Sequence, residues 1–126
     1  MAKLDSQGNL IWACDFDSSN ITSVAYCGDF VFAGDTQGAY KCRSYDGYGY
    51  NYLYGAPGYM GFMDTRVAGF RENGQWYLYM LNVVTGSDWY FGADTGTLLR
   101  KLDMNNNTLW ARQFGTQQYD NNAHYY

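Results

Sequence analysis

Proline, histidine and charge are scarce in this 126-residue chain, and each shortage excludes a class of protein. A single proline beside 15 glycines favours many tight turns over disordered linkers. Charged residues make up only 16 %, with 8 basic against 12 acidic and no basic run, which argues against binding nucleic acid through its phosphates. No apolar stretch approaches the 18 residues that a membrane helix needs, so we expect no membrane insertion.

Catalytic and ligand-binding motifs are also missing. The one histidine, His124, cannot build a histidine-rich metal site, and no HExxH, GxSxG, P-loop or GxGxxG pattern occurs. Asp15 and Asp17 lie two residues apart with Asp5 nearby, but no calcium-loop pattern follows them. We therefore expect no enzymatic activity, no catalytic residue, no cofactor and no metal.

Three cysteines, Cys14, Cys27 and Cys42, form an odd set whose spacing matches no zinc or CxxC pattern. We expect them to be buried as small apolar residues on strands. One disulfide plus one free thiol is the alternative.

Aromatic residues, at 20 % with 14 tyrosines, alternate with turn signals in a pattern typical of β-structure. Asn73-Gly74 is the strongest of these signals, because both residues accept the positive φ of a two-residue hairpin turn. No window has the apolar spacing of a helix, so the sequence predicts an all-β protein. The expected strands are 21–26, 30–33, 38–44, 48–54, 66–72, 75–84, 89–92, 97–102 and 108–114.

A repeat links the two ends of the chain. The segment Lys3–Ala13 returns 98 residues later as Lys101–Ala111, with Lys, Leu, Asp, Trp and Ala in the same order and spacing. A weaker middle copy places Asp46 with Asp5 and Asp103, which gives units of 41 and 57 residues. A 41-residue unit of four short strands has the size of one β-propeller blade. The extra 16 residues of the longer unit fall around Gly58–Asn73, and we interpret them as an extended hairpin or as a hairpin inserted between blades.

The pattern of a Gly-Asp turn, an FAGDTQG strand and a KLDSQGNLIWA strand pair resembles the blade repeats of quinoprotein-like β-propellers. In this resemblance an Asp begins a tight turn and a Trp packs between neighbouring blades, whereas the middle copy has Leu53 where Trp is expected. The resemblance implies antiparallel four-stranded blades: about two full blades, with terminal strands that need neighbours. The single repeat domain then divides into a strand pair, a blade, a blade with an inserted hairpin and the start of a further unit, at 1–16, 17–57, 58–114 and 115–126.

The repeated Asp and Trp residues have structural roles in this reading. A turn-opening Asp accepts hydrogen bonds from the backbone N–H groups that follow it, and a Trp buries a large flat area between stacked sheets. The structural repeat residues are Asp5, Trp12, Asp46, Asp103 and Trp110.

Tyrosines at alternate positions form a second feature. Tyr48, Tyr50, Tyr52 and Tyr54 would share one face of a strand. We interpret this face as sheet packing or a subunit interface, with a platform for sugar rings as the alternative.

Two blades alone would expose their aromatic faces, and repeat proteins avoid this by stacking or capping. The sequence therefore predicts a structural protein that assembles head to tail or by strand exchange with copies of itself, as an extracellular filament or viral structural component. A cytoplasmic setting remains open. The expected assembly tail is His124, Tyr125 and Tyr126. The alternatives are a lectin-like propeller module that binds carbohydrate or protein, and a fragment of a larger propeller.

Overall fold

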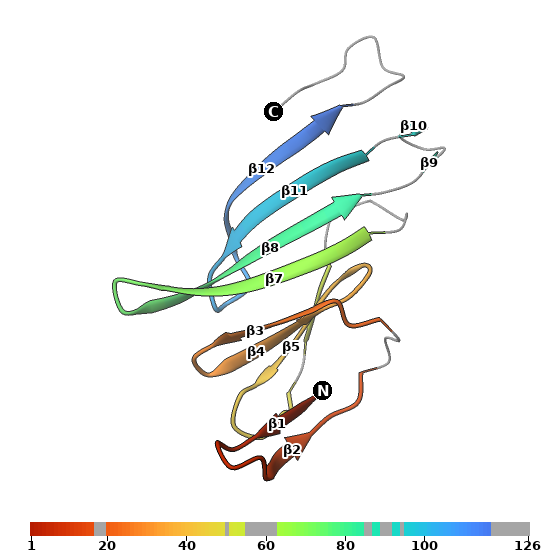
Figure 1. Cartoon of the computed structure of the whole chain (residues 1–126). Coiled ribbons are helices and arrows are strands. Elements are labelled where there is room, and N and C mark those ends of the chain that lie inside the picture. The colour runs from red at the N-terminus through yellow and green to blue at the C-terminus, as the bar shows by residue number, and fades with distance from the viewer. Residues whose placement is uncertain are drawn as a thin grey trace.

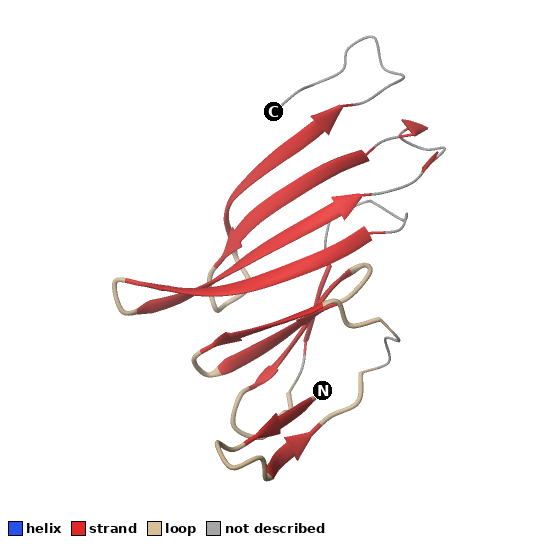
Figure 2. Cartoon of the chain, viewed as in Figure 1, coloured by secondary structure: helices blue, strands red, loops and turns tan. Residues whose placement is uncertain are grey.

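A computed structural model describes residues 1–16, 20–49, 51–54, 63–84, 87–88, 92–93 and 95–116. Every regular element in these ranges is a β-strand (Figure 2). The longer strands form three layers. The first layer contains β1 (Ala2–Leu4) and β2 (Leu10–Ala13), and the second, or middle, layer contains β3 (Ser23–Cys27), β4 (Phe30–Gly34), β5 (Gly38–Arg43) and β6 (Asn51–Tyr54). The third layer contains β7 (Met63–Glu72), β8 (Gln75–Val84), β11 (Thr95–Leu102) and β12 (Thr108–Thr116). A short pair, β9 (Ser87–Asp88) and β10 (Gly92–Ala93), lies between β8 and β11 in the chain. The protein is therefore all-β, as the sequence predicts.

Both four-stranded sheets are antiparallel meanders. The middle sheet has the order β3-β4-β5-β6, and the third sheet has the order β12-β11-β8-β7. Two-residue turns join the strands where the sequence carries Gly-Asp and Asn-Gly, with Cys27 opposite Phe30 and Glu72 opposite Gln75. At the second turn Asn73 and Gly74 have φ values of 49° and 80°, as this hairpin requires.

The extra length of the second unit lies partly in an extended hairpin, which is one of the two forms we expected from the sequence. Residues 63–72 are β7, which pairs with β8 as the first strand of the third sheet and is not part of a separate inserted hairpin. The strands β7 and β8 have 10 residues each, against 5 in β3 and β4, and β9–β10 adds a further excursion. Residues 58–62 lie outside the described ranges.

The three layers stack in chain order, from β1–β2 through the middle sheet to the third sheet (Figure 1). One core, between β1–β2 and the middle sheet, contains Trp12, Phe16, Val31, Ala33 and Cys42. The other, between the two four-stranded sheets, contains Ala25, Cys27, Phe32, Ala39, Val67, Leu78, Met80 and Leu102. Each face of the middle sheet is thus covered by a neighbouring layer.

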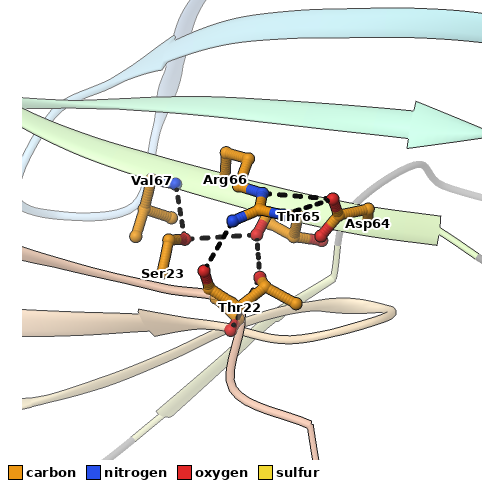
Figure 3. Close-up of polar contacts among 7 residues, drawn as sticks. Thr22, Ser23, Asp64, Thr65, Arg66 and Val67 are labelled. Carbon is orange, nitrogen blue, oxygen red and sulfur yellow. Dashed lines mark hydrogen bonds and ion pairs between the residues drawn. The ribbon is translucent and has the colours of Figure 1, made fainter.

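The first strands of the two sheets, β3 and β7, are joined by polar contacts (Figure 3). The Thr22 and Ser23 hydroxyls both donate to the Thr65 carbonyl, and the Arg66 guanidinium donates to the Thr22 carbonyl at 2.8 Å. Gly69 permits this approach, because a Cβ there would lie 2.2 Å from the Tyr26 carbonyl oxygen. The two sheets are therefore closest along their first strands.

The tyrosine series does not form one strand face. Strand β6 begins only at Asn51, and Tyr48 lies in the preceding turn with 71 % of its surface exposed. Tyr52 packs edge-on against Tyr40 at 4.7 Å between ring centroids and donates to Asp35 at 2.7 Å. Tyr50 lies outside the described residues, as does the side chain of Tyr54. The turn after Arg43 is longer than the sequence pattern indicated, and this moves Tyr48 off the strand.

Candidate functional site

The repeated end segments fold into the same hairpin. In both, Lys pairs with Trp across the strands (Lys3 with Trp12, Lys101 with Trp110), and an irregularity follows the Lys. The N–H of Asp5 donates to the Asn9 carbonyl at 2.9 Å, and the N–H of Asp103 donates to the Asn107 carbonyl at 3.0 Å.

The carboxylates of these two turns have matching partners. Asp5 accepts bonds from the backbone N–H groups of Gln7 and Asn9 and from the Asn9 amide. Asp103 accepts the corresponding three bonds from Asn105 and Asn107. These bonds lower the pKa of both carboxyl groups below their ordinary value. Both aspartates thus fix a turn, and most of their acceptor sites are already used there.

Asp46 has a different place from the one the sequence pattern assigned to it. In the middle sheet Arg43 is the residue whose N–H closes the turn, by donating to the Tyr48 carbonyl at 3.0 Å. Asp46 lies inside this longer turn, where it pairs with the Arg43 guanidinium at 2.7 Å and accepts from the N–H of Tyr48. By strand pairing, Lys41 and Asn51 occupy the positions of Lys3 and Trp12.

Trp12 is covered by the middle sheet. Its indole N–H donates to the Ser44 carbonyl at 3.0 Å, and only 8 % of its surface is exposed. Its ring lies against Gly47, where a Cβ would come within 2.8 Å. The Lys3 ammonium donates to the same Ser44 carbonyl at 2.7 Å. This face of the β1–β2 hairpin is therefore fully used inside the chain.

The equivalent face of the third sheet is turned away from the middle sheet, and we call it the outer face. Trp110 is only half-buried there, and it contacts Tyr79 edge-on at 6.0 Å between centroids. Phe70 meets Tyr79 in the same way at 6.2 Å. Strand alternation and register place these further side chains on the outer face: Asp64, Arg66, Ala68, Leu81, Val83, Thr97, Leu99, Arg112 and Phe114.

Charge is sparse on the outer face and lies mostly at its margins. The Lys101 ammonium pairs with Glu72 at 2.7 Å, which raises the pKa of Lys101. It also lies over the ring of Tyr77, and the Arg112 guanidinium lies over Trp110. The face is thus an aromatic and aliphatic surface, with Phe70 and Phe114 about half exposed. Contiguous exposed apolar surface is found at protein interaction sites, in ligand-binding grooves and on aggregation-prone surfaces.

A cleft of about 330 Å³ opens where three turns of the two large sheets meet. Its lining combines aromatic rings with carboxylates and amides: Cys27, Asp29, Phe30, Gln75, Trp76, Tyr77, Asp103, Met104 and Asn105. Such a lining can stack a ring face and hydrogen-bond hydroxyl groups.

No protein-family model, curated protein or solved structure matches this chain.

Among the described residues, no three His, Cys, Asp or Glu side chains gather as metal ligands would. The same part of the chain contains no helix that is long and apolar enough to cross a membrane. His124, Tyr125 and Tyr126, the expected assembly tail, lie outside the described residues, as does Asp17.

Sequence reasoning noted the lysines at the two ends of the chain but gave them no role, and it missed Lys41 and the glycine that faces Trp12, Gly47. The signal was present, because Lys41-Cys42-Arg43 parallels Lys3-Leu4-Asp5. Aligning the copies on Asp46 concealed it, since that aspartate lies three residues beyond the turn's first residue.

Proposed function

We propose that this protein is a non-enzymatic structural protein that assembles head to tail with copies of itself through its outermost sheets. One observation carries the proposal. The same hairpin occurs twice: the middle sheet covers its Trp face at Trp12, whereas among the described residues no further sheet packs on that face at the half-buried Trp110.

The opposite faces of the two hairpins support the same conclusion. Leu102 is 3 % exposed because the middle sheet covers it, whereas its equivalent Leu4 is 56 % exposed. Leu10, which pairs with Leu4 across the strands, is 63 % exposed. Each outermost layer therefore lacks one neighbour, and the two missing neighbours lie on opposite sides of the stack. If the Leu4 face of a second copy packs on the outer face of the first, one contact covers both exposed surfaces.

Such a contact joins two different surfaces, so it repeats from copy to copy. Contacts of this type close into a ring if the rotation between copies allows it, and otherwise build a filament. The two four-stranded layers have the strand number and meander order of propeller blades, and a closed ring of such layers would be a propeller made from several chains. Stacking of this kind also removes the exposed aromatic surface that favours aggregation.

Light scattering coupled to size-exclusion chromatography tests the proposal over a dilution series of the purified chain. We expect the wild type to form oligomers or polymers. Leu99→Lys, which places a charge in the middle of the outer face, should leave a monomer. Thr108→Lys is the control, because Thr108 is exposed and pairs with Leu102, whose side of the sheet faces the middle sheet. A wild type that stays monomeric, or equal assembly by both variants, contradicts the proposal.

The cleft beside Trp76 supports a second candidate, carbohydrate binding. Trp76 and Tyr77 offer ring faces, and Asp29, Gln75 and Asn105 offer groups that could bond to sugar hydroxyls. A glycan array would test it, with Trp76→Ala as the comparison. Binding lost in this variant supports a sugar site, and no glycan bound by the wild type excludes it.

A further inference from the structure

The proposed stacking has a register that can be read from three lysines. Lys3, Lys41 and Lys101 lie at the same position, two residues before the residue whose N–H closes the turn. Those closing residues are Asp5, Arg43 and Asp103. The three lysines therefore project from equivalent places in three successive layers.

Two of these lysines bind the next layer at the same place. Lys3 donates to the carbonyl of Ser44, the residue directly after Arg43. Lys41 donates to the carbonyl of Met104, the residue directly after Asp103, and to the Asn106 side chain at 2.9 Å. Each lysine thus reaches the second residue of the turn in the layer that follows.

Lys101 already has the geometry of Lys41. The Lys41 ammonium lies 4.0 Å from the ring centroid of Phe30 and 5.9 Å from that of Phe32. The Lys101 ammonium lies 4.1 Å from the centroid of Tyr77 and 5.8 Å from that of Tyr79. What differs is the acceptor, because Lys101 pairs with Glu72 of its own sheet. Among the described residues, the Lys101 ammonium therefore has no counterpart of the carbonyl acceptor that Lys3 and Lys41 find in the next layer.

The size of the facing residue matches as well. Each turn has one residue with positive φ just before its end: Gly47 at 74°, Asn106 at 69° and Gly8 at 88°. Gly47 faces Trp12, and the layer that carries Asn51 at the Trp position is followed by Asn106. By analogy with Trp12, we expect the turn of a layer packed on Trp110 to have glycine at this position. Gly8 fits, since a Cβ there would meet nothing within 4 Å.

We propose that the β1–β2 turn of a second copy docks on the outer face. In this arrangement the Lys101 ammonium donates to the Ser6 carbonyl of the second copy, and the ring of Trp110 packs on its Gly8. The Trp110 N–H donates to the same Ser6 carbonyl, as that of Trp12 does to Ser44. The docking rests on the proposed head-to-tail assembly and specifies its partner surface.

Gly8→Asn and Trp110→Ala test this docking from its two sides. Asparagine suits the Gly8 turn, because Asn106 holds the same place with positive φ, but its side chain would occupy the space of the Trp110 ring. Each variant alone should shift the concentration of half-dissociation upward by about tenfold or more. Circular dichroism confirms that each remains folded. Lys101→Met is a further variant outside the turn and should weaken assembly in the same direction.

A mixture of the two variants gives the sharper result. Gly8→Asn keeps an intact outer face, and Trp110→Ala keeps an intact β1–β2 turn. At a protein concentration between the half-dissociation values of the wild type and of the variants, each variant alone should be monomeric. The mixture should form one intact junction per pair of chains and therefore stop as a dimer. The docking is wrong if the mixture stays monomeric, or if Gly8→Asn assembles as well as the wild type does. The proposed function still stands in either case, provided that the wild type itself forms polymers. A wild type that never assembles overturns both.

Discussion

Trp12 lies so close to Gly47 that a Cβ on residue 47 would come within 2.8 Å of the indole ring. Position 47 thus has two reasons to be glycine, since its φ of 74° also lies in the left-handed region. Gly8 also has a left-handed backbone, with a φ of 88°, but it is not crowded, because no atom lies within 4 Å of where its Cβ would be.

Alanine at these two glycines should therefore separate backbone strain from crowding. Gly8→Ala should lower the free energy of unfolding by about 1–2 kcal/mol, the cost of holding an L-residue in the left-handed region. Gly47→Ala should lose about 1–3 kcal/mol more, because Trp12 or the turn must shift. Urea unfolding at a concentration where the chain is monomeric measures both. Equal losses would show that Trp12 does not rest on residue 47.

The two tryptophans should also differ in their contribution to the stability of the monomer. Trp12→Ala empties a buried site and removes the bond to Ser44, so we expect a loss of about 3–5 kcal/mol. Trp110→Ala should cost clearly less, about 1 kcal/mol, because the outer face is already partly in water. Thermal unfolding of dilute samples compares them. A larger loss at Trp110 would mean that its ring is buried in the monomer.

The cysteines should divide by burial when treated with iodoacetamide at pH 8. All three are free thiols, and burial raises the pKa of Cys27 and of Cys42 to about 11. The thiolate is the reactive form, so both should stay unmodified in the folded protein, while the half-buried Cys14 reacts. Intact mass should show one adduct under native conditions and three in urea. Rapid labelling of Cys27 would indicate that the two large sheets separate readily.

Much of this fold follows from local sequence patterns. Asn73-Gly74 and Gly28-Asp29 define their hairpins because few other dipeptides suit such turns. The end repeat also predicts two equivalent aspartate turns, since the same residues at the same spacing form the same bonds. Cys27 and Cys42 are buried on strands as expected, whereas Cys14 is half-buried just after β2; all three are free thiols, so the alternative with one disulfide is wrong.

What the sequence leaves open is which face each layer covers. Lys101-Leu102 and Lys3-Leu4 are identical pairs, yet Leu102 is buried and Leu4 exposed, and only the stacking order decides this. The middle turn is a different case: the ion pair between Arg43 and Asp46 is local to the turn, but it has no counterpart in the two end copies of the repeat. A contact that depends on the neighbouring layer leaves no local pattern to read.

The aspartate turns should make the protein sensitive to acid. Asp103 accepts three hydrogen bonds, which lower its pKa below the ordinary value near 3.8. A carboxyl whose pKa is lowered on folding stabilises the folded state above the ordinary pKa, and this contribution is lost as the pH falls through the folded value. Asp5 and Asp46 have pKa shifts in the same direction. The melting temperature should therefore decline as the pH drops below about 4.

Asp103→Asn isolates one of these contributions, because asparagine keeps an oxygen acceptor for the turn but cannot ionise. The variant should melt below the wild type at pH 7, and the difference should shrink toward zero at about pH 2, where the wild-type carboxyl is protonated as well. Asp15→Asn, at an exposed carboxyl, serves as the control. The charged carboxylate accepts stronger hydrogen bonds than a neutral amide oxygen, so the gap between the two melting curves measures that charge. A gap that stays constant with pH would instead mean that Asp103 acts through its shape alone.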